Sequence, residues 1–598
     1  MMWFTADLHL GDTNILHDMD RPFTSVEEMN RKVIDAINEC VAADDRLYIL
    51  GDFTYRLPMA EAVCLRERIA CQNVTLIRGN HDGDWEDPDA PQIWDDVRDY
   101  LEIAPGYAKG HRLVLSHYPM LSWNGKARGA IMLHGHIDTV DVDDFGRYKP
   151  YAFDCDKLAE VFRDAELPEE ARRDLESGDY LFGRGACDMK GGDAVFLVLA
   201  KHLAEQAEKL HGNLLLSFNP VEETLHRGII EELPLLRKLQ EQHNLTFRLA
   251  INNDFICPMY AGDTTRYVYT GAVGKLLPMF YIIGRETHVA QCFEGFSPDL
   301  TAAELTRIID RNPDFCDGYN GEYTLPPTVL KMQDLKPRYN VQTPHTAAVY
   351  FNYFVHNRQL TEIMAQLKDT ARTALNNVMQ AADERYRTYC EISGNHYSSL
   401  IEKTQVIDYR ELYLRAKETC DGDLDAYIDS VTDASISAGD DMRITSLRIV
   451  QALSDLCGIK TPTVVVFFAT PFCPHNTLKK ENADEARVIS DLEKIASAFS
   501  AESGEVMKLQ QFFPSLTDSS YLKIDDDDDS VAMLKNCFPG YEKLYPVPLE
   551  TAKALNIPAV NYGVWGKDCH KWTERIYMPY SFGKLPDFIA KTIHYYFD

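Results

Sequence analysis

The sequence lacks the features that would tie it to a membrane or to secretion. None of its 598 residues falls in an apolar run that approaches the roughly 18 residues needed for a membrane-spanning helix. The opening residues, MMWFTADLHLGD, contain no basic segment followed by an apolar stretch, which argues against a signal peptide. We therefore expect a cytoplasmic protein without a membrane partner.

Positive charge and paired cysteines are also scarce. Lysine and arginine number 61 against 92 acidic residues, so the formal net charge is −31 and the sequence pI is about 5.0. This balance argues against a nucleic acid or an anionic membrane as a bulk partner. The fourteen cysteines form no CxxC pair, a pattern typical of reduced cytosolic thiols in a chain of this length.

Length and apolar content are what the chain does have. Hydrophobic residues make up 45% and aromatic residues 11%, which indicates a folded globular protein rather than a disordered one. A chain of 598 residues is too long for one core, so we expect two to four domains.

Four predicted strands in the first quarter of the chain end in polar residues. In order, these ends are Asp7-Leu8-His9, Gly51-Asp52, Gly79-Asn80-His81-Asp82 and Ser116-His117. Predicted helices near Val26–Cys40 and Pro58–Ala70 separate the first three strands, the alternation of an α/β sandwich. A single buried histidine is usually structural, but four such strand ends in succession indicate more than that.

This order of motifs resembles the calcineurin-like metallophosphoesterases over residues 1–137, and the segments NIL and RPFTSVEEMN strengthen the match. The resemblance implies two divalent ions (Mn²⁺, Fe or Zn²⁺) acting on a phosphoester substrate, since hard carboxylates and imidazoles suit such ions. It implies the metal ligands Asp7, His9, Asp52, Asn80, His117 and His136. His81 would protonate the leaving group.

A second set of acids follows from residue 136 onward. Its parts are His136-Ile137-Asp138-Thr139-Val140, the glycine-rich run GRGACDMKGG at 183–192, Glu222-Glu223 after a predicted strand at Leu214–Phe218, and Asp254 after another at Phe247–Ile251. Acids at the carboxyl ends of strands that alternate with helices indicate an α/β sheet with its site along one edge. Adjacent glutamates are normally surface charge, yet the four features together favour a site.

These features resemble the di-zinc aminoacylase and carboxypeptidase-G family, which includes the desuccinylases. YVYTGAVGKLLPMFYIIGRETHV and FEGFSPDLTAAEL are similar to its arginine-utilisation, RocB-like branch, and the match runs from about residue 134 to the C-terminus. The resemblance implies an amidohydrolase or peptidase that cleaves an amide bond of an N-acyl amino acid or a small peptide. Two Zn²⁺ ions, or Co²⁺ or Mn²⁺, would serve it.

Carried over by position, the resemblance implies one zinc on His136 and Asp254, a second on Glu223 and His570, and Asp188 as the bridge. Asp138 would orient His136 and fix its tautomer. Glu222 would be the general base that takes a proton from the attacking water and passes it to the leaving amine. His570 is identified because, in GKDCHKWTE, a glutamate follows it four residues later.

The same resemblance implies an inserted α+β lid domain at 268–395, which divides the catalytic domain into 138–267 and 396–598. Lys275–Ile283 predicts a strand, and apolar positions from Leu360 to Ala382 predict a helix with one apolar face. In the family a lid histidine reaches a partner subunit's site to stabilise the oxyanion. His288 stands at that position, which allows a homodimer; the alternative is an ordinary loop histidine.

His136 belongs to both sets of ligands. Imidazole–metal bonds are about 2.0–2.1 Å long, so one ring cannot serve two separate sites. The phosphoesterase motif ends Gly-His-x-His, whereas Asp138 stands in the last place here, as the amidohydrolase motif requires. We predict that His136 points into the acidic cluster of the larger domain, which leaves the N-terminal site short of two ligands.

Two alternatives stay open. One is phosphoesterase activity through the N-terminal domain, and the other is a fusion product in which neither site is complete. Members of the amidohydrolase family carry a helix and strands before H-x-D-T-V that complete the catalytic sheet, and phosphoesterase-like sequence replaces them here. A natural fusion and a joined reading frame both fit this junction.

Overall fold

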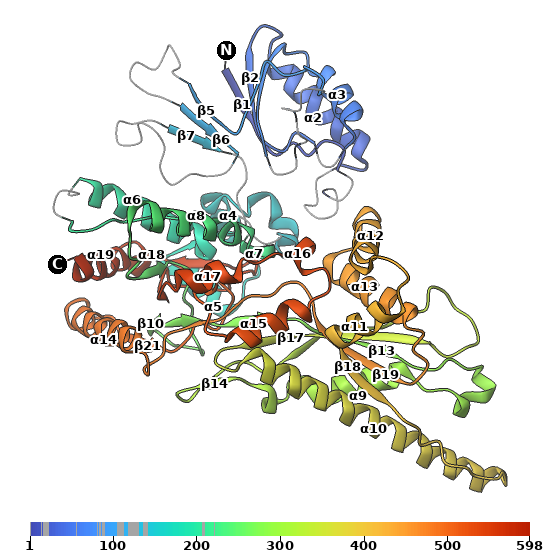
Figure 1. The fold of residues 1–598 in the computed structure, drawn as a ribbon. Helices are drawn as coiled ribbons and strands as arrows, with labels where there is room; N and C mark the ends of the chain where they lie inside the picture. Colours follow the sequence, from blue (N-terminus) through green and yellow to red (C-terminus); the bar gives the residue numbers. More distant parts are fainter. Residues whose placement is uncertain are drawn as a thin grey trace.

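The computed structural model of the chain describes residues 2–12, 15, 23–54, 57–79, 82, 85, 90–103, 113–117, 131–134, 142–205, 210–219 and 222–597. It has an N-terminal α/β unit, a larger α/β body and a lid from which the long helix α10 (Leu360–Ser393) extends (Figure 1). This architecture confirms the predicted mixed α/β class. The predicted site residues Asn80, His81, His136 and Asp138 lie outside the described residues.

The first sheet of the N-terminal unit has four parallel strands in the order β1-β2-β3-β4. Its strands are β1 (Met2–Thr5), β2 (Arg46–Leu50), β3 (Asn73–Ile77) and β4 (Asp96–Arg98), and its helices are α2 (Val26–Cys40) and α3 (Met59–Glu67). The predicted strands and helices here are confirmed to within a few residues. Because the strands are parallel, the polar residues that follow them gather at one edge.

A second sheet of this unit contains β5 (Tyr100–Ile103), β6 (Leu113–Ser116) and β7 (Ile131–His134). β7 lies parallel to β6, with His134 opposite Ser116. The strand that leads to the hinge motif therefore belongs to the N-terminal unit. The predicted orientation of His136 stays a prediction.

Residues 142–190 connect the two units. They form η2 (Asp143–Tyr151), α4 (Cys155–Phe162), α5 (Glu169–Ser177), β8 (Tyr180–Phe182) and η3 (Ala186–Lys190). β8 pairs with β24 (Arg575–Tyr577), which in turn pairs with β23 (Gly566–Lys567). This small sheet brings the glycine-rich run at 183–192 against the C-terminal loop that carries His570.

The larger body is built on a four-stranded sheet in the order β21-β10-β22-β9. Its strands are β9 (Ala250–Asn252), β10 (Arg266–Tyr269), β21 (Met507–Gln510) and β22 (Ala559–Asn561). Apolar side chains of α6 (Gly191–Ala204), α14 (Ala483–Ser503) and α19 (Leu585–Phe597) pack in the core that covers it. Strands from both ends of the lid insertion thus meet in one sheet.

One predicted strand is wrong. Leu214–Phe218 lies outside every strand of the structure, and Leu214 and Leu215 are 42% and 49% exposed. A strand is held by hydrogen bonds to a neighbour, and β9, at the edge of its sheet, pairs only with β22 among the described strands. For the same reason the second predicted strand, Phe247–Ile251, shortens to β9.

The lid is a six-stranded sheet in the order β12-β17-β13-β19-β18, with β16 also paired to β17. Its strands are β12 (Gly274–Leu276), β13 (Pro278–Ile283), β16 (Thr328–Asp334), β17 (Thr346–Val355), β18 (Gln405–Asp408) and β19 (Thr463–Phe468). The predicted lid boundary at residue 395 needs correction, because β19 pairs along the whole of β13. The predicted strand at Lys275–Ile283 divides into β12 and β13.

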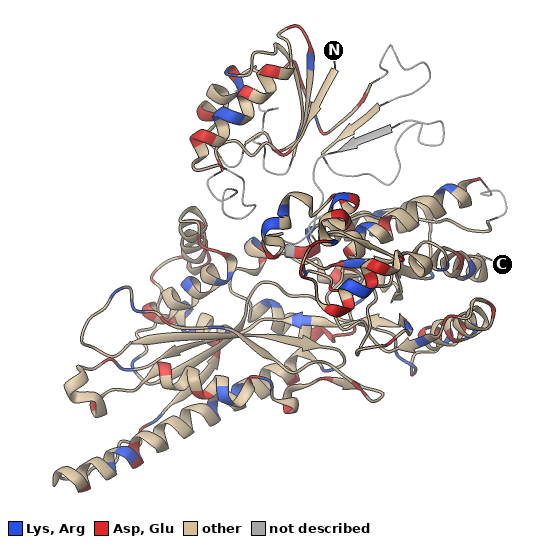
Figure 2. Cartoon of the chain, turned by 180° about the vertical axis from the view of Figure 1, so that it is seen from behind, with Lys and Arg blue, Asp and Glu red and all other residues tan. Residues whose placement is uncertain are grey.

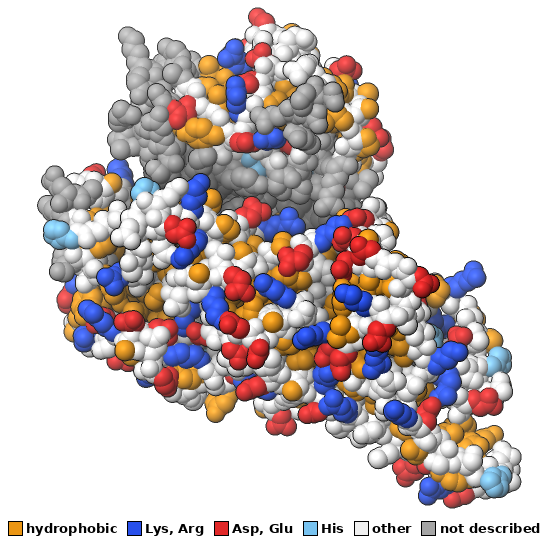
Figure 3. Space-filling view, viewed as in Figure 1, with side chains coloured by type: hydrophobic (Ala, Val, Ile, Leu, Met, Phe, Trp, Pro, Cys, Tyr) orange, Lys and Arg blue, Asp and Glu red, His pale blue; other side chains and the backbone are white. Residues whose placement is uncertain are grey.

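Helix α10 confirms the predicted amphipathic helix. Leu367, Ala371 and Leu375 are fully buried in the lid core together with apolar residues of α9 (Pro298–Ile309). The far end of α10 is different, since Tyr389 and Ile392 are 47% and 81% exposed. Hydrophobic side chains are visible at the surface of this end of the lid in Figure 3.

The remaining helices and strands belong to the body and the lid. They are α7 (Glu222–Leu225), α8 (Arg227–His243), β11 (Gly271–Ala272), η5 (Val289–Glu294), η6 (Pro313–Phe315), β14 (Gly318–Tyr319), β15 (Glu322–Tyr323), α11 (Tyr409–Thr419), α12 (Leu424–Ser437), α13 (Met442–Leu456), β20 (Asn476–Thr477), η7 (Asp518–Leu522), α15 (Asp528–Asn536), α16 (Tyr541–Leu544), α17 (Leu549–Leu555) and α18 (Met578–Ser581). Among the helices of the described residues, none has the length and apolar character needed to cross a membrane.

Candidate metal centres

The N-terminal unit gathers a carboxylate and imidazole cluster at one edge of its first sheet. Ligand atoms of Asp7, Asp52 and His117 all lie within 4.8 Å of one another. The Nε2 atoms of His9 and His117 are each 3.5 Å from the same oxygen of Asp52, which is fully buried. The structure therefore brings together Asp7, His9, Asp52 and His117 of the predicted N-terminal set.

Close backbone packing shapes this cluster. A Cβ atom on Gly51 would lie 2.1 Å from Nδ1 of His117, and one on Gly79 would lie 2.2 Å from Oδ1 of Asp52. Only glycine fits at either position, and Gly51 also has a φ of +88°. The Gly-Asp and Gly-Asn-His-Asp motifs need their glycines for this approach.

Asp82 is a site residue to which the sequence analysis gave no role. Its carboxylate accepts backbone hydrogen bonds from Gly79, Asp52 and Phe53 at 2.8–2.9 Å, so it ties the loop after β3 to the loop after β2. Burial raises its pKa to about 6 against the opposing effect of these hydrogen bonds. The final aspartate of the GNHD motif was the available signal.

The larger body gathers a second cluster from three distant segments. Nε2 of His570 lies 2.8 Å from Asp188 and 3.1 Å from Glu223, and ligand atoms of the three residues lie within 4.8 Å of one another. Asp188 comes from η3, Glu223 from α7, and His570 from the turn after β23, where its φ is +64°. The two carboxylates raise the pKa of His570 to about 10.

Glu222 and Asp254 complete the acidic surroundings of this cluster. Asp254, two residues after the end of β9, is buried and accepts a hydrogen bond from the backbone of Phe255. Burial raises the pKa of both carboxyl groups, and the nearby acids, including Asp188, raise it further. The structure thus places Asp188, Glu222, Glu223, Asp254 and His570 in one region.

Glu574 joins the two loops that carry Asp188 and His570. Its carboxylate accepts hydrogen bonds from the backbone of Cys187 at 3.0 Å and of Asp188 at 3.2 Å, and it pairs with the buried guanidinium of Arg184. Burial raises the pKa of Glu574 to about 7. The sequence analysis used this glutamate only to locate His570, and the structure shows what it touches.

A buried histidine and a partly buried aspartate lie beside Glu222. Nδ1 of His226 is 3.0 Å from Oδ1 of Asp518 and 3.7 Å from Oε1 of Glu222. Asp518 begins η7, 292 residues further along the chain. The sequence analysis missed both residues, and a histidine four residues after a paired glutamate was the only signal in the sequence.

The donor set of the larger cluster fits a divalent metal. Several partly or fully buried carboxylates lie close together beside the more exposed imidazole of His570, and a bound cation stabilises such a group of like charges. Nitrogen and oxygen ligands of this kind suit zinc. The N-terminal cluster has the same donor types, and glycines give its ligands room.

The last predicted residue, His288, lies apart from both clusters on the lid. It is exposed, precedes η5, and its Nδ1 accepts a hydrogen bond from the backbone of Ala290 at 3.1 Å. No partner chain is present, so its predicted role stays a prediction.

Comparisons with known proteins assign the chain to a family. The model of the peptidase family M20/M25/M40 matches residues 132–500. Protein RocB of Bacillus subtilis is 36% identical over 475 residues, which cover 79% of this chain and 83% of RocB. The chain belongs to the M20/M25/M40 peptidase family. It is therefore a metal-dependent hydrolase of the amidohydrolase and peptidase type.

Two further relatives cover different shares of the chain. The uncharacterised protein YqjN of Bacillus subtilis is 34% identical over 468 residues, 77% of this chain and 83% of YqjN. The uncharacterised protein MJ1445 of Methanocaldococcus jannaschii is 30% identical over 151 residues, 25% of this chain and 76% of MJ1445.

The model of the calcineurin-like phosphoesterases matches residues 2–199, so both family models include residues 132–199. The M20 chain thus carries an N-terminal phosphoesterase-like unit, and the hinge with His136 lies in the shared region.

Proposed function

We propose that the larger cluster is a di-zinc centre that cleaves an amide bond. The convergence of Asp188, Glu223 and His570 within 4.8 Å, with Asp254 buried beside them, is the observation that carries this proposal. Asp188 would bridge two ions, Asp254 and His136 would hold one, and Glu223 and His570 the other. The ions would polarise the amide carbonyl and lower the pKa of the attacking water.

Glu222 is the general base of this proposal. It lies close to Asp518, Asp254 and Glu223, and burial raises its pKa, so it holds a proton more readily than an exposed glutamate does. Such a carboxylate can take a proton from the attacking water and give it to the leaving amine. Asp138 would fix the orientation of His136.

The substrate class is an N-acyl amino acid or a small peptide. The similarity to RocB and the branch-specific segments around residues 268–290 support a place in amino-acid catabolism, with arginine as one candidate. All fourteen cysteines are free thiols, which supports a reducing compartment such as the cytoplasm.

The lid supplies the second part of the proposal, a homodimer in which His288 stabilises the oxyanion in the partner's site. Exposed apolar residues near His288 support a contact surface there: Val289 is 57% exposed and Val341 49%. His288 forms an isolated antiparallel β-bridge with Gln342, the residue after Val341. The histidine and this surface therefore lie on the same part of the lid.

The cluster of Asp7, Asp52 and His117 supports a second candidate function, the hydrolysis of a phosphate mono- or diester. Asn80 and His136 would complete its metal ligands, and His81 would protonate the leaving group. Because β7 pairs with β6, the chain enters the hinge motif from the edge of this unit's sheet. The two candidate functions therefore compete for His136.

Metal content and three substitutions test the main proposal. Glu222→Gln keeps the shape of the side chain but removes the proton acceptor, so hydrolysis of an N-acetyl amino acid should fall by roughly 10²–10⁴-fold. Metal content, measured by elemental analysis, should stay the same. Glu223→Ala should lower both metal content and activity, whereas a loss that follows only Asp52→Ala would assign the activity to the N-terminal unit.

His136→Ala tests the competition between the two sites. If His136 serves the larger cluster, the variant should lose amidohydrolase activity and keep whatever phosphodiesterase activity the chain has. Loss of phosphodiesterase activity with intact amidohydrolase activity would assign His136 to the N-terminal site.

A further inference from the structure

A large cavity opens beside the larger cluster. Its volume is about 1480 Å³, and its lining includes Asp188, Glu222, Glu223 and Asp254 at one end. Sites for small molecules typically measure about 300–1,000 Å³. The cavity is therefore larger than a single N-acyl amino acid or dipeptide requires, and it is continuous with the proposed reaction centre.

Unpaired backbone lines this cavity. Residues 213–219 are extended along it, and within the described part of the chain none of their backbone groups hydrogen-bonds to another backbone group. Residues 246–249, which lead into β9, also line it and lack such bonds. Residues 213–215 and 217 are exposed, so water satisfies these backbone groups in the free protein. An extended peptide can replace that water, because its own donors and acceptors come in the matching order.

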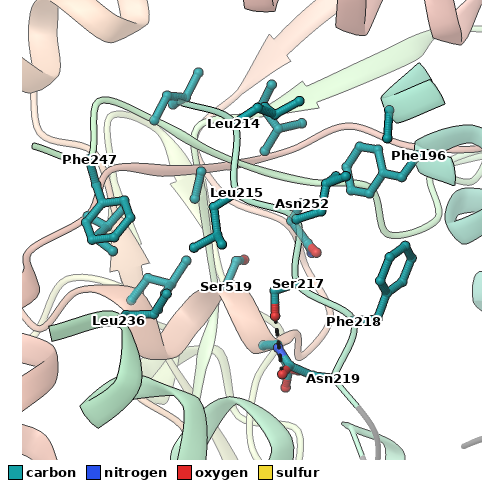
Figure 4. A pocket seen from close by; sticks show the side chains of 18 of the residues that line it. Phe196, Leu214, Leu215, Ser217, Phe218, Asn219, Leu236, Phe247, Asn252 and Ser519 are labelled. Atoms are coloured by element: carbon teal, nitrogen blue, oxygen red, sulfur yellow. Dashed lines mark hydrogen bonds between the residues drawn. The ribbon is translucent and has the colours of Figure 1, made fainter. Parts of the chain in front are cut away.

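The side chains around this backbone are mainly apolar. Leu215 and Phe247 point into the space between the segments in Figure 4, and Leu236 of α8 approaches it from below. Phe196 lines the side that α6 contributes. Such walls select apolar side chains in whatever binds there.

Charge differs between the two ends of the cavity. Residues 213–219 lead to Glu222, and residues 246–252 lead to Asp254, so both segments run toward the acidic cluster. His211 and Arg248 line the cavity where these segments begin. A peptide carboxylate is complemented at that basic end, and its amino end then lies toward the acids.

We propose that this cavity binds an extended apolar peptide as an added strand along residues 213–219, with its carboxyl end at Arg248. The proposal deepens the proposed function and rests on it for the reaction, since it adds peptides longer than a dipeptide to the substrate class. Seven residues of strand span about 23 Å at 3.3 Å per residue, so a peptide of six or seven residues uses the whole edge.

Binding to the full-length Glu222→Gln chain tests the proposal without hydrolysis. The probe is a heptapeptide of alternating leucine and alanine with an N-terminal lysine that carries a fluorophore on its side chain, and anisotropy reports its affinity. N-methylation of alternate backbone nitrogens removes hydrogen-bond donors and keeps the side chains. We expect at least tenfold weaker binding of the methylated peptide and weaker binding after C-terminal amidation.

A matched pair of variants locates the probe. Leu215→Asp places a charge in the cavity wall at a residue that is already 49% exposed, so we expect it to fold and to bind the heptapeptide at least tenfold more weakly. Leu235→Asp changes a leucine of α8 that is 58% exposed and lies outside the cavity lining, and should leave the affinity unchanged. Circular dichroism checks that both variants are folded.

Three results would overturn the proposal: equal affinity for the methylated and unmethylated peptides, displacement of the probe by dodecanoate at similar concentration, or equal effects of the two aspartate variants. The first two would mean that the cavity takes an acyl chain without reading a backbone. Hydrolysis of N-acetyl amino acids by the unsubstituted chain reports separately on the proposed function, so the two can fail independently.

Discussion

His226 is a buried residue whose position depends on an acid far away in the chain. Its φ of +52° is a backbone conformation that histidine adopts more readily than most side chains do. This conformation, at the start of α8, puts the ring beside Asp518 and within 3.7 Å of Glu222. We infer that Asp518 holds the ring and that the ring positions Glu222.

His226→Ala should lower kcat by roughly ten- to a hundredfold, with little change in KM, because it removes the hydrogen bond to Asp518 and with it the ring that lies against Glu222. His226→Asn should recover part of this loss, because an asparagine amide nitrogen occupies nearly the place of Nδ1 and asparagine tolerates the positive φ. Steady-state kinetics measures both. The exposed His202→Ala serves as the control, and an unchanged kcat in His226→Ala would exclude the positioning role.

The sequence identified candidate ligands more readily than the residues that contact them. Asp7, Asp52, Asp188 and Asp254 could be found because each follows a recognisable local pattern. Glu574 and the His226–Asp518 pair could not, because their effects depend on contacts across hundreds of residues. The role of Asp82 depends on contacts with Asp52 and Phe53, only about thirty residues away. The loops after β2 and β3 that make these contacts have no periodic pattern in the sequence from which they could be predicted.

At the scale of elements, Glu574 holds the C-terminal loop to η3. Glu574→Ala would leave two backbone N–H groups without their buried acceptor and would remove one of the two carboxylates that pair with Arg184. Because Asp144 stays 2.6 Å from Arg184, we expect a cost of about 3 kcal/mol, the lower end of the range for a broken buried ion pair. We expect the larger body to unfold at correspondingly lower denaturant concentration and to bind metal more weakly. Urea titration followed by fluorescence measures the first effect.

Glu550→Ala is the matched control for this prediction. Glu550 is 73% exposed and pairs loosely with Lys535 at 3.7 Å, so its loss should change stability by less than about 1 kcal/mol. Equal destabilisation by the two substitutions would show that Glu574 has no special part in joining the loops.

His356, just after β17, makes the stability of the lid junction depend on pH. It is fully buried, its Nδ1 lies 2.9 Å from the hydroxyl of Thr477, and its ring centroid is 4.1 Å from that of Phe512. Burial lowers its pKa to about 3 from 6.5, and the nearby His475 lowers it further. The ring therefore stays neutral in the folded protein at pH values where the unfolded chain is protonated.

The unfolded chain binds a proton at His356 below pH 6.5, whereas the folded protein does so only near pH 3. The contribution of His356 to the free energy of unfolding is therefore present in full above pH 6.5 and is lost as the pH falls toward 3. Between pH 7 and pH 5 the loss should reach about 2 kcal/mol. Denaturant titrations of the unsubstituted chain and of His356→Gln, each at pH 7 and at pH 5, isolate the contribution of His356 to the free energy of unfolding. The variant should lose about 2 kcal/mol less over this range, and parallel losses in the two proteins would contradict the assignment.

Periodic patterns predicted most elements, and the failures have a physical cause. The fifteen-residue helix α2 and the apolar face of α10 follow from spacing alone. Leu214–Phe218 has the composition of a strand, but composition does not supply a hydrogen-bonded neighbour. The lid boundary was misplaced because β19 belongs to the sheet of β13, a pairing between residues nearly two hundred positions apart.

At the scale of the whole molecule, charge is spread widely. Lysine and arginine positions are interspersed with aspartate and glutamate positions along the ribbon in Figure 2. The acids of the larger cluster are partly or fully buried. The net charge of −31 is therefore a property of the entire surface, and it favours solubility more than it guides a particular partner.

A dimer would make each site depend on two chains. His288→Ala should lower turnover with little change in metal content, as expected when an oxyanion donor is lost. Mixing His288→Ala chains with Glu222→Gln chains should restore part of the activity, because a hybrid dimer holds one site with both groups intact. Chromatography with light scattering gives the oligomeric state, and a fully active monomer would exclude a shared site.

The strand order of the larger sheet bears on how the chain folds during synthesis. β22, between β9 and β10, ends at Asn561, so this sheet cannot close until nearly all of the printed sequence has left the ribosome. At about 5–20 residues per second, more than 400 residues after β7 take roughly 20–90 s to translate. Strand β6 is already available when β7 emerges. Strand β7, which leads to His136, can therefore pair with β6 before the sheet of the larger body has been synthesised.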